Sequence, residues 1–221
     1  GEKMSGARGK LIVYMCSLIE SRNYAAENHC EQIKKFTEIM LEKVRQFCPE
    51  YELDEKKCEH IVLASPTHDI GKISISDKIL NKPGRLTNDE FMVMKNHTLK
   101  GKHIFENMLR DMDETDPDYE LFCCCREICM FHHERFDGSG YPFGLKGNEI
   151  PIGAQIVGLA DAYDALVSER IYKPAYDKEE AFNMILEGEC GVFNPRLIEI
   201  FRMIRMELEE ILEKTESSNI Y

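Results

Sequence analysis

The chain has 221 residues and a formal net charge of −12, with 43% apolar and 31% charged residues. This composition is typical of a soluble globular protein with one large or two small domains, and it excludes membrane insertion because no apolar run approaches the ~20 residues of a spanning helix. The acidic balance argues against binding to a nucleic-acid polymer, which needs a basic face. An anionic substrate would therefore need a local positive pocket.

Nine cysteines are many for this length, but their pattern is not that of a disulfide framework. Cys123, Cys124 and Cys125 are consecutive, and Cys129 follows one turn later. Neighbouring helical residues point about 100° apart, so these four thiols cannot converge on one ion. We expect reduced cysteines that act as small apolar residues in a cytoplasmic protein, and the start of the chain has no signal-peptide pattern.

The first part of the chain carries three helical patterns. Residues 1–9 have the character of a tag remnant or linker. Apolar residues recur at helical spacing over 10–22 and again over 25–47. Asp54 is placed to cap a helix that runs to about His68.

The middle of the chain continues the helical pattern and then breaks it. The sequence TNDE fits a capping box, with Thr87 as the N-cap and Glu90 three residues later. The helix that it opens is expected to reach about Leu109. After the break DETDPD, another helix is expected to reach about His132, and residues 133–150 then form a long Gly-rich loop.

The last third of the chain returns to helices. Pro151 suits a first helical turn, and the apolar helix after it is expected to end near Ser168. Two further helices are predicted over about 178–187 and 195–213, and residues 214–221 form a polar tail.

These patterns predict a single all-α domain, a helical bundle over residues 10–213. We expect about seven to nine helices, because neither a repeat nor an alternating strand pattern interrupts the helical periodicity. A loop of about 18 residues is unusual inside a compact helical domain, and it indicates a functional site.

Potential metal ligands lie near the apolar faces of the predicted helices. They are His29, His68, Asp69, His97, His132, His133 and Asp161. A lone histidine there is more often structural, but a carboxylate within IVGLADAYDALV is costly unless it is paired or bound to metal. Nitrogen and oxygen ligands with one carboxylate able to bridge suit two metals ~3.5–4 Å apart. Such ligands favour Fe, Mn or Zn.

We expect that three other polar residues are not metal ligands. His60 lies two turns before His68, and His103 falls on a different face from His97. Asp164, one turn after Asp161, is expected to support the site from behind rather than to bind a metal.

Two motifs resemble a known family. ASPTHDIGKI at 64–73 resembles the signature of the HD metal-dependent phosphohydrolases, and HHERFDGSGYP at 132–142 resembles that of the HD-GYP subfamily, the bacterial cyclic di-GMP phosphodiesterases. DKILNKPGRLTNDEFMVMKNHTLKG and ADAYDALVSERIYK are similar to that subfamily in order and spacing. The resemblance covers about residues 25–201 and implies an HD-GYP helical bundle that acts in second-messenger signalling.

The resemblance also implies a role for each matching residue. The seven histidines and aspartates named above would be metal ligands, and Asp69 would bridge two metals. Asp69 and Lys72 would be the catalytic residues, and for Lys72 we add our own hypothesis that it stabilises the phosphate or the departing 3′ oxygen. Substrate would be bound by Lys72, Tyr141, Arg170 and Lys173, whose basic members would supply the positive pocket.

One departure from the subfamily concerns the element Glu-x-x-x-His. His29 matches its histidine, but Ala25 stands at the glutamate position. A glutamate one turn earlier would share the face of His29, whereas Glu27 is rotated from it by about 200°. In the family that glutamate is tied to an extra metal, so we predict a dinuclear centre.

The resulting hypothesis is a phosphodiesterase that hydrolyses cyclic di-GMP to linear pGpG through a hydroxide activated by two divalent ions, Fe or Mn first and Zn next. Further hydrolysis to GMP stays open. Two alternatives also stay open: a non-catalytic cyclic dinucleotide receptor, which Ala25 motivates, and a phosphodiesterase for another cyclic dinucleotide. The protein partners considered are a fused or upstream receiver or sensor domain and a second copy in a homodimer.

Overall fold

The computed structural model describes residues 2–23, 28–168 and 175–218, and the regular elements of this part of the chain are all helices. This confirms the all-α prediction. The α-helices of these residues are α1 (Glu2–Glu20), α2 (His29–Phe47), α3 (Glu55–Ala64), α4 (Asp77–Leu80), α5 (Asn88–Lys95), α6 (His97–Arg110), α7 (Tyr119–Phe131), α8 (Ile152–Val167), α9 (Lys178–Glu187), α10 (Pro195–Met203) and α11 (Arg205–Ser218).

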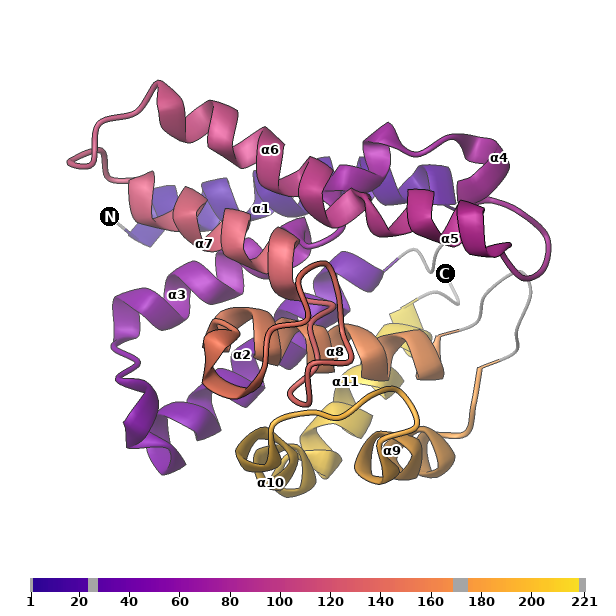
Figure 1. The fold of residues 1–221 in the computed structure, drawn as a ribbon. Coiled ribbons are helices and arrows are strands. Elements are labelled where there is room, and N and C mark those ends of the chain that lie inside the picture. The colour runs from indigo at the N-terminus through magenta and orange to yellow at the C-terminus, as the bar shows by residue number, and fades with distance from the viewer. Residues whose placement is uncertain (1, 24–27, 169–174, 219–221) are drawn as a thin grey trace.

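Helix α8 forms the centre of the bundle. In Figure 1, α6 and α7 run side by side above it, while α9 and α10 lie below. Helix α8 packs on α2 and α7, and it is apolar on nearly all sides, as expected of a helix enclosed by others. Its fully buried Tyr163 contacts Phe36 of α2 and Phe201 of α10.

Two glycines allow the close backbone approaches that assemble the centre of the fold. A Cβ at Gly158 of α8 would lie 2.2 Å from the carbonyl oxygen of His132. A Cβ at Gly71 would lie 1.9 Å from the carbonyl oxygen of His97. Only glycine fits such contacts. The first contact brings α8 against the backbone of His132, and the second brings the segment after α3 against the backbone of His97. Both of these histidines are predicted ligands.

The predicted caps agree with the structure. Asp54 accepts a hydrogen bond from the backbone N–H of Lys57 at 2.7 Å, and Thr87 and Glu90 form a complete capping box. Helix α3 ends at Ala64, earlier than expected, and short 3-10 helices follow it. These caps and turns depend on neighbours a few residues apart, which explains why sequence predicts most of them.

The structure divides two helices that were expected to be continuous. The helix expected to reach Leu109 breaks at Asn96, where the ring of His97 donates to the carbonyl of Met94 at 2.8 Å. That carbonyl would accept from a backbone N–H in an unbroken helix. The helix expected over 195–213 breaks at the buried Ile204. These breaks and the four-residue α4 raise the count within the described residues above the expected seven to nine.

The long loop after α7 is confirmed. It follows His132 and contains one short 3-10 helix, at Gly147–Glu149, before α8 begins. Helix α1 begins at Glu2 and α11 extends to Ser218, so both enter the segments expected to be linker and tail. The division of the chain into linker, domain and tail stays a prediction. Within the described residues, every helix is too short or too polar to cross a bilayer.

Candidate metal centre

The structure brings all seven predicted ligands together at one place. Two overlapping groups offer ligand atoms within 4.8 Å of one another: Asp69, His97, His132 and His133 in the first, and Glu20, His29, His68 and Asp69 in the second. Asp161 lies beside the second group, with Oδ1 3.7 Å from the Nε2 atoms of both His29 and His68. Their role as ligands stays a prediction, but their convergence is a property of the fold.

Three of the histidines are held in one tautomer by backbone carbonyls. His68, His97 and His132 each use Nδ1 in a hydrogen bond to a carbonyl oxygen, those of Ser65 (2.9 Å), Met94 (2.8 Å) and Ile128 (3.0 Å). A carbonyl only accepts, so Nδ1 carries a proton, and in the neutral ring Nε2 presents its lone pair to the centre. Such bonding is the usual support of a metal-binding histidine.

Asp69 faces both groups with different oxygens. Its Oδ1 lies 3.2 Å from Nε2 of His97 and 3.8 Å from Nε2 of His132, while Oδ2 lies 3.5 Å from Nε2 of His68. Among the described residues, the buried Oδ1 has no hydrogen-bond partner. Two ligands bound to one ion at about 2.1 Å lie about 3.0 to 3.4 Å apart at ordinary angles. The cluster therefore fits cations, with Asp69 able to bridge two of them.

The charges of the cluster favour a bound cation. Burial lowers the pKa of His68, but the charges of Asp69 and Asp161 outweigh it and raise that pKa to about 10. Burial and the charge of His68 lower the pKa of His132 to about 3. Burial would raise the pKa of Asp69, yet Lys72 and His68 hold it well below its usual range. Ionised carboxylates thus concentrate negative potential where the Nε2 atoms converge.

The predicted substrate residues are only partly described. Lys72 contacts Asp69 Oδ2 through its ammonium group. The ring of Tyr141 stacks on His133, with centroids 4.6 Å apart and planes 24° from parallel. Arg170 and Lys173 lie outside the described residues, as does Ala25. Lys72 and Tyr141 therefore border the cluster from different elements.

A pair on α5 was not predicted. The ammonium of Lys95 lies 4.7 Å from the ring centroid of Phe91 and 5.3 Å from that of Tyr141. Phe91 is exposed and meets Tyr141 edge to face at 6.2 Å. The sequence signal that could have revealed this pair is the position of a lysine two residues before the predicted ligand His97. The pair gives the edge of the site a cation and two aromatic faces.

Glu134 holds the loop that carries Tyr141. Its buried carboxylate accepts the backbone N–H groups of Phe143 at 2.8 Å and Leu145 at 3.0 Å. The next residue, Arg135, donates to the carbonyl of Cys190 and lies over the ring of Phe193. The motif HHERFDGSGYP thus includes residues that fix the loop as well as the two histidines.

Comparison with known proteins identifies the family. A family model described as HD domain matches residues 21–197.

The chain belongs to the HD domain family.

Curated proteins are also similar to this chain over most of its length. The HD domain is 37% identical to a probable cyclic di-GMP phosphodiesterase of Vibrio cholerae, over 92% of this chain and 46% of that protein. It is 32% identical to a 3′3′-cGAMP-specific phosphodiesterase 2 of the same organism, over 86% of this chain and 34% of that protein.

A solved structure shares the fold. Bd1817, an HDG"Y"P protein from Bdellovibrio bacteriovorus, matches with a TM-score of 0.62 at 17% identity, over 92% of this chain and 62% of that one. The chain spans about half the length, or less, of the curated relatives named above. Phosphohydrolases of the HD domain family depend on metals, and the His/Asp cluster here could hold them.

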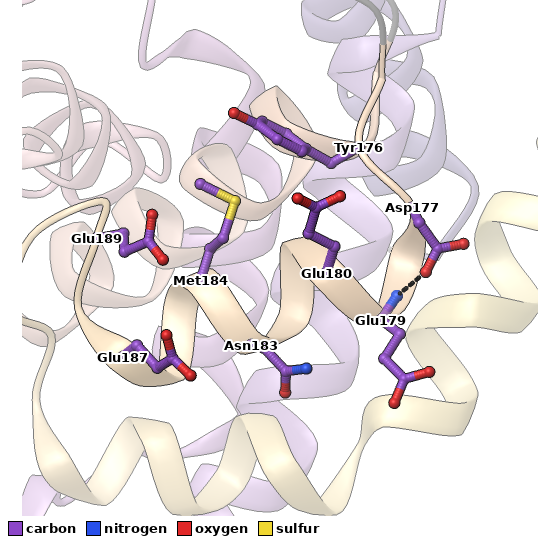
Figure 2. A pocket seen from close by; sticks show the side chains of 8 residues that line it. All are labelled: Tyr176, Asp177, Glu179, Glu180, Asn183, Met184, Glu187 and Glu189. Atoms are coloured by element: carbon purple, nitrogen blue, oxygen red, sulfur yellow. Dashed lines mark hydrogen bonds between the residues drawn. The ribbon is translucent and has the colours of Figure 1, made fainter.

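A pocket of the HD domain differs in character from the His/Asp cluster. It lies on α9 and is lined by Tyr176, Asp177, Glu179, Glu180, Asn183, Met184, Glu187 and Glu189 (Figure 2). Asp177 caps α9 by accepting the backbone N–H of Glu179 at 2.9 Å. None of these lining residues belongs to the His/Asp cluster, and their carboxylates would repel an anionic substrate.

Proposed function

We propose that this HD domain is a metal-dependent phosphodiesterase that hydrolyses cyclic di-GMP to linear pGpG. The observation that carries the proposal is the placement of Asp69 between two groups of Nε2 atoms, with one carboxylate oxygen facing each. The 37% identity to a probable cyclic di-GMP phosphodiesterase supports the choice of substrate. Because the chain covers only part of such relatives, the activity of the whole protein belongs to the same proposal.

We assign two divalent ions to the cluster. Asp69 would bridge them; His97, His132 and His133 would hold one, and His29, His68 and Asp161 the other. Imidazole and carboxylate ligands suit Fe or Mn, and Zn as a further option. Bound cations would supply Lewis-acid polarisation of the phosphodiester and acidify a water molecule.

The residues at the edge of the cluster would hold the substrate. Lys72, anchored beside Asp69, is suited to bind a phosphate oxygen and to offset charge on the departing 3′ oxygen. Tyr141 and Phe91 offer aromatic faces to a nucleobase, and Lys95 adds a positive charge between them. Arg170 and Lys173 are assigned to the phosphates from their place in the motif alone.

A second candidate substrate is 3′3′-cGAMP. The identity of 32% to a phosphodiesterase specific for it favours this candidate. The two cyclic dinucleotides share the diester that would be attacked and differ in one base. Base recognition would then depend on the wall near Tyr141 rather than on the metal ligands.

The cysteines and the length of the relatives support a proposal for the cellular setting. None of the nine cysteines, all of which lie in the described residues, forms a disulfide, which supports the reducing cytoplasm as the location. The relatives are longer than this chain, which supports a fused receiver or sensor domain as the source of regulation. We also propose that the whole protein forms a homodimer.

Turnover by anaerobically purified protein tests the proposed function. Protein loaded with Fe or Mn should convert cyclic di-GMP to pGpG, measured by liquid chromatography beside 3′3′-cGAMP. Asp69→Ala should abolish turnover, whereas Asp89→Ala, at an exposed position of α5, should keep it. Tight binding of the dinucleotide without turnover under any metal would show a receptor instead.

A further inference from the structure

We propose that Glu20, the last residue of α1, is a metal ligand of this HD domain and adds a carboxylate to the ion assigned to His29, His68 and Asp161 in the proposed dinuclear centre. The inference rests on the proposed metal centre and adds to it a residue that the motifs do not contain. Glu20 precedes the segment matched by the family model, which begins at residue 21. It also lies nine positions before His29 in the sequence, not four.

The carboxylate of Glu20 reaches the second group of ligands. Its Oε1 lies 3.5 Å from Nε2 of His29, and its side chain is 12% exposed. With His29, His68 and Asp69 it offers four ligand atoms within 4.8 Å of one another. Without Glu20, the second group would have two imidazoles and the shared carboxylate, with Asp161 beside them.

Hydrogen bonding aims one oxygen of Glu20 at the cluster. Oε2 accepts the thiol of the buried Cys30 at 3.0 Å, whereas the buried Oε1 has no hydrogen-bond partner among the described residues. An ionised carboxylate oxygen in such a position is costly unless a positive charge meets it. Asp69, which belongs to the same group, also has a buried oxygen without a hydrogen-bond partner among the described residues, the Oδ1 that faces the first group.

An ordinary ion pair with His29 explains this arrangement less well. The Nδ1 of His29 is engaged by Asp164 at 2.6 Å, and its Nε2 lies 3.3 Å from Nε2 of His68. The 3.3 Å contact joins the two imidazole nitrogens to each other and leaves the carboxylate oxygen without a hydrogen bond. Two imidazole nitrogens and a carboxylate oxygen that converge in this way resemble the ligands of one cation. The separations of 3.3 and 3.5 Å are close to the roughly 3.0 to 3.4 Å expected of ligands that share an ion.

Packing of α1 explains how Glu20 arrives there. Helix α1 contacts α2 and the 3-10 helices on both sides of His68 and Asp69. On the helix, the buried Val13 and Cys16 face the protein, and Cys16 packs in one cluster with Cys30. A carboxylate one turn beyond Cys16 therefore enters the site from α1, on the face that is already buried.

Equilibrium Mn²⁺ binding to the full chain, followed by electron paramagnetic resonance of free Mn²⁺ and by elemental analysis, tests the proposal. Glu20→Gln should weaken one class of site by about tenfold or more and leave the other class unchanged. Glu31→Gln, an exposed glutamate on α2, is the matched control and should bind Mn²⁺ like the unaltered chain. Circular dichroism of each metal-free variant checks that it folds.

The outcomes separate the two proposals. If the unaltered chain binds no Mn²⁺, the proposed metal centre fails. If the unaltered chain binds Mn²⁺ and Glu20→Gln binds it equally well, Glu20 is not a ligand. The same conclusion follows if Glu27→Gln weakens Mn²⁺ binding and Glu20→Gln does not. In both cases the proposed function stands. If Glu20→Gln does not fold, anomalous diffraction from Mn-loaded crystals of the unaltered chain decides instead. A Glu20 oxygen at about 2.2 Å from the ion supports the proposal, and one beyond about 3 Å overturns it.

Discussion

His29 and Asp164 form a buried pair behind the candidate metal centre, with Nδ1 and Oδ2 separated by 2.6 Å. Both side chains are almost inaccessible to solvent, and the pair joins the start of α2 to α8. Burial lowers the pKa of His29, but the charge and hydrogen bond of Asp164 outweigh it, and the net shift is upward. Asp164 therefore makes His29 a stronger base and directs its Nε2 toward the ligand cluster.

Replacing Asp164 should weaken metal binding without touching a ligand. In Asp164→Asn, the amide can donate to Nδ1 and so move the ring proton to Nε2, where it blocks coordination. We expect an affinity for Mn²⁺ lower by about 10- to 100-fold, measured by titration. Ser168→Ala, which removes only the hydroxyl that donates to Asp164 at 3.3 Å, should have a much smaller effect. Equal affinities in Asp164→Asn and the unaltered chain would contradict this role.

Lys95 should contribute to substrate binding more than to chemistry. Its ammonium lies over the rings of Phe91 and Tyr141 at the edge of the cluster rather than among the ligands. Lys95→Met should raise KM for the cyclic dinucleotide by about three- to tenfold, the effect of losing one such cation, with a smaller change in kcat. Lys100→Met, an exposed lysine on α6, is the control. An unchanged KM in Lys95→Met would remove the residue from the substrate site.

Gly158→Ala should destabilise the protein because α8 has no room for a methyl group there. The added Cβ would lie 2.2 Å from the backbone oxygen of His132, which cannot move aside without shifting the end of α7. We expect a loss of about 1 to 3 kcal/mol in the free energy of unfolding, measured in urea. Gly153→Ala on the same helix meets only the side chain of Ile61, at 3.1 Å, and should cost less. A smaller loss in Gly158→Ala than in Gly153→Ala would show that α8 approaches His132 less closely.

Removing metal should lower the stability of the folded state. The carboxylates of the buried Asp69 and the partly buried Asp161 face one another's charge across the cluster, and a bound cation would offset that repulsion. A ligand present at 100 times its Kd stabilises the native state by about 2.7 kcal/mol. Chelation should therefore lower Tm in a scan of the loaded protein, while Asp69→Ala should respond little. A Tm that chelation leaves unchanged would argue against ions bound at this cluster.

Local sequence signals determined much of this protein. Asp54 and the pair Thr87 and Glu90 cap helices through hydrogen bonds to residues three positions away, so their roles depend on nearby sequence alone. The resemblance carried by the HD and GYP motifs and the segments between and after them predicted the seven side chains that meet. Each of those ligands sits at a helix end or on the central helix α8, where the backbone direction follows from the motif.

Only the tertiary structure decided what completes the site. The break at Asn96, which starts α6 at His97, depends on that ring bonding the Met94 carbonyl beside the cluster. Glu20 has no sequence link to His29, because α1 and α2 are separate helices with independent faces. Its carboxylate reaches the cluster because α1 packs against α2 and the segments around Asp69. Whether side chains of different helices converge depends on how those helices pack, and a spacing rule within one helix cannot predict this.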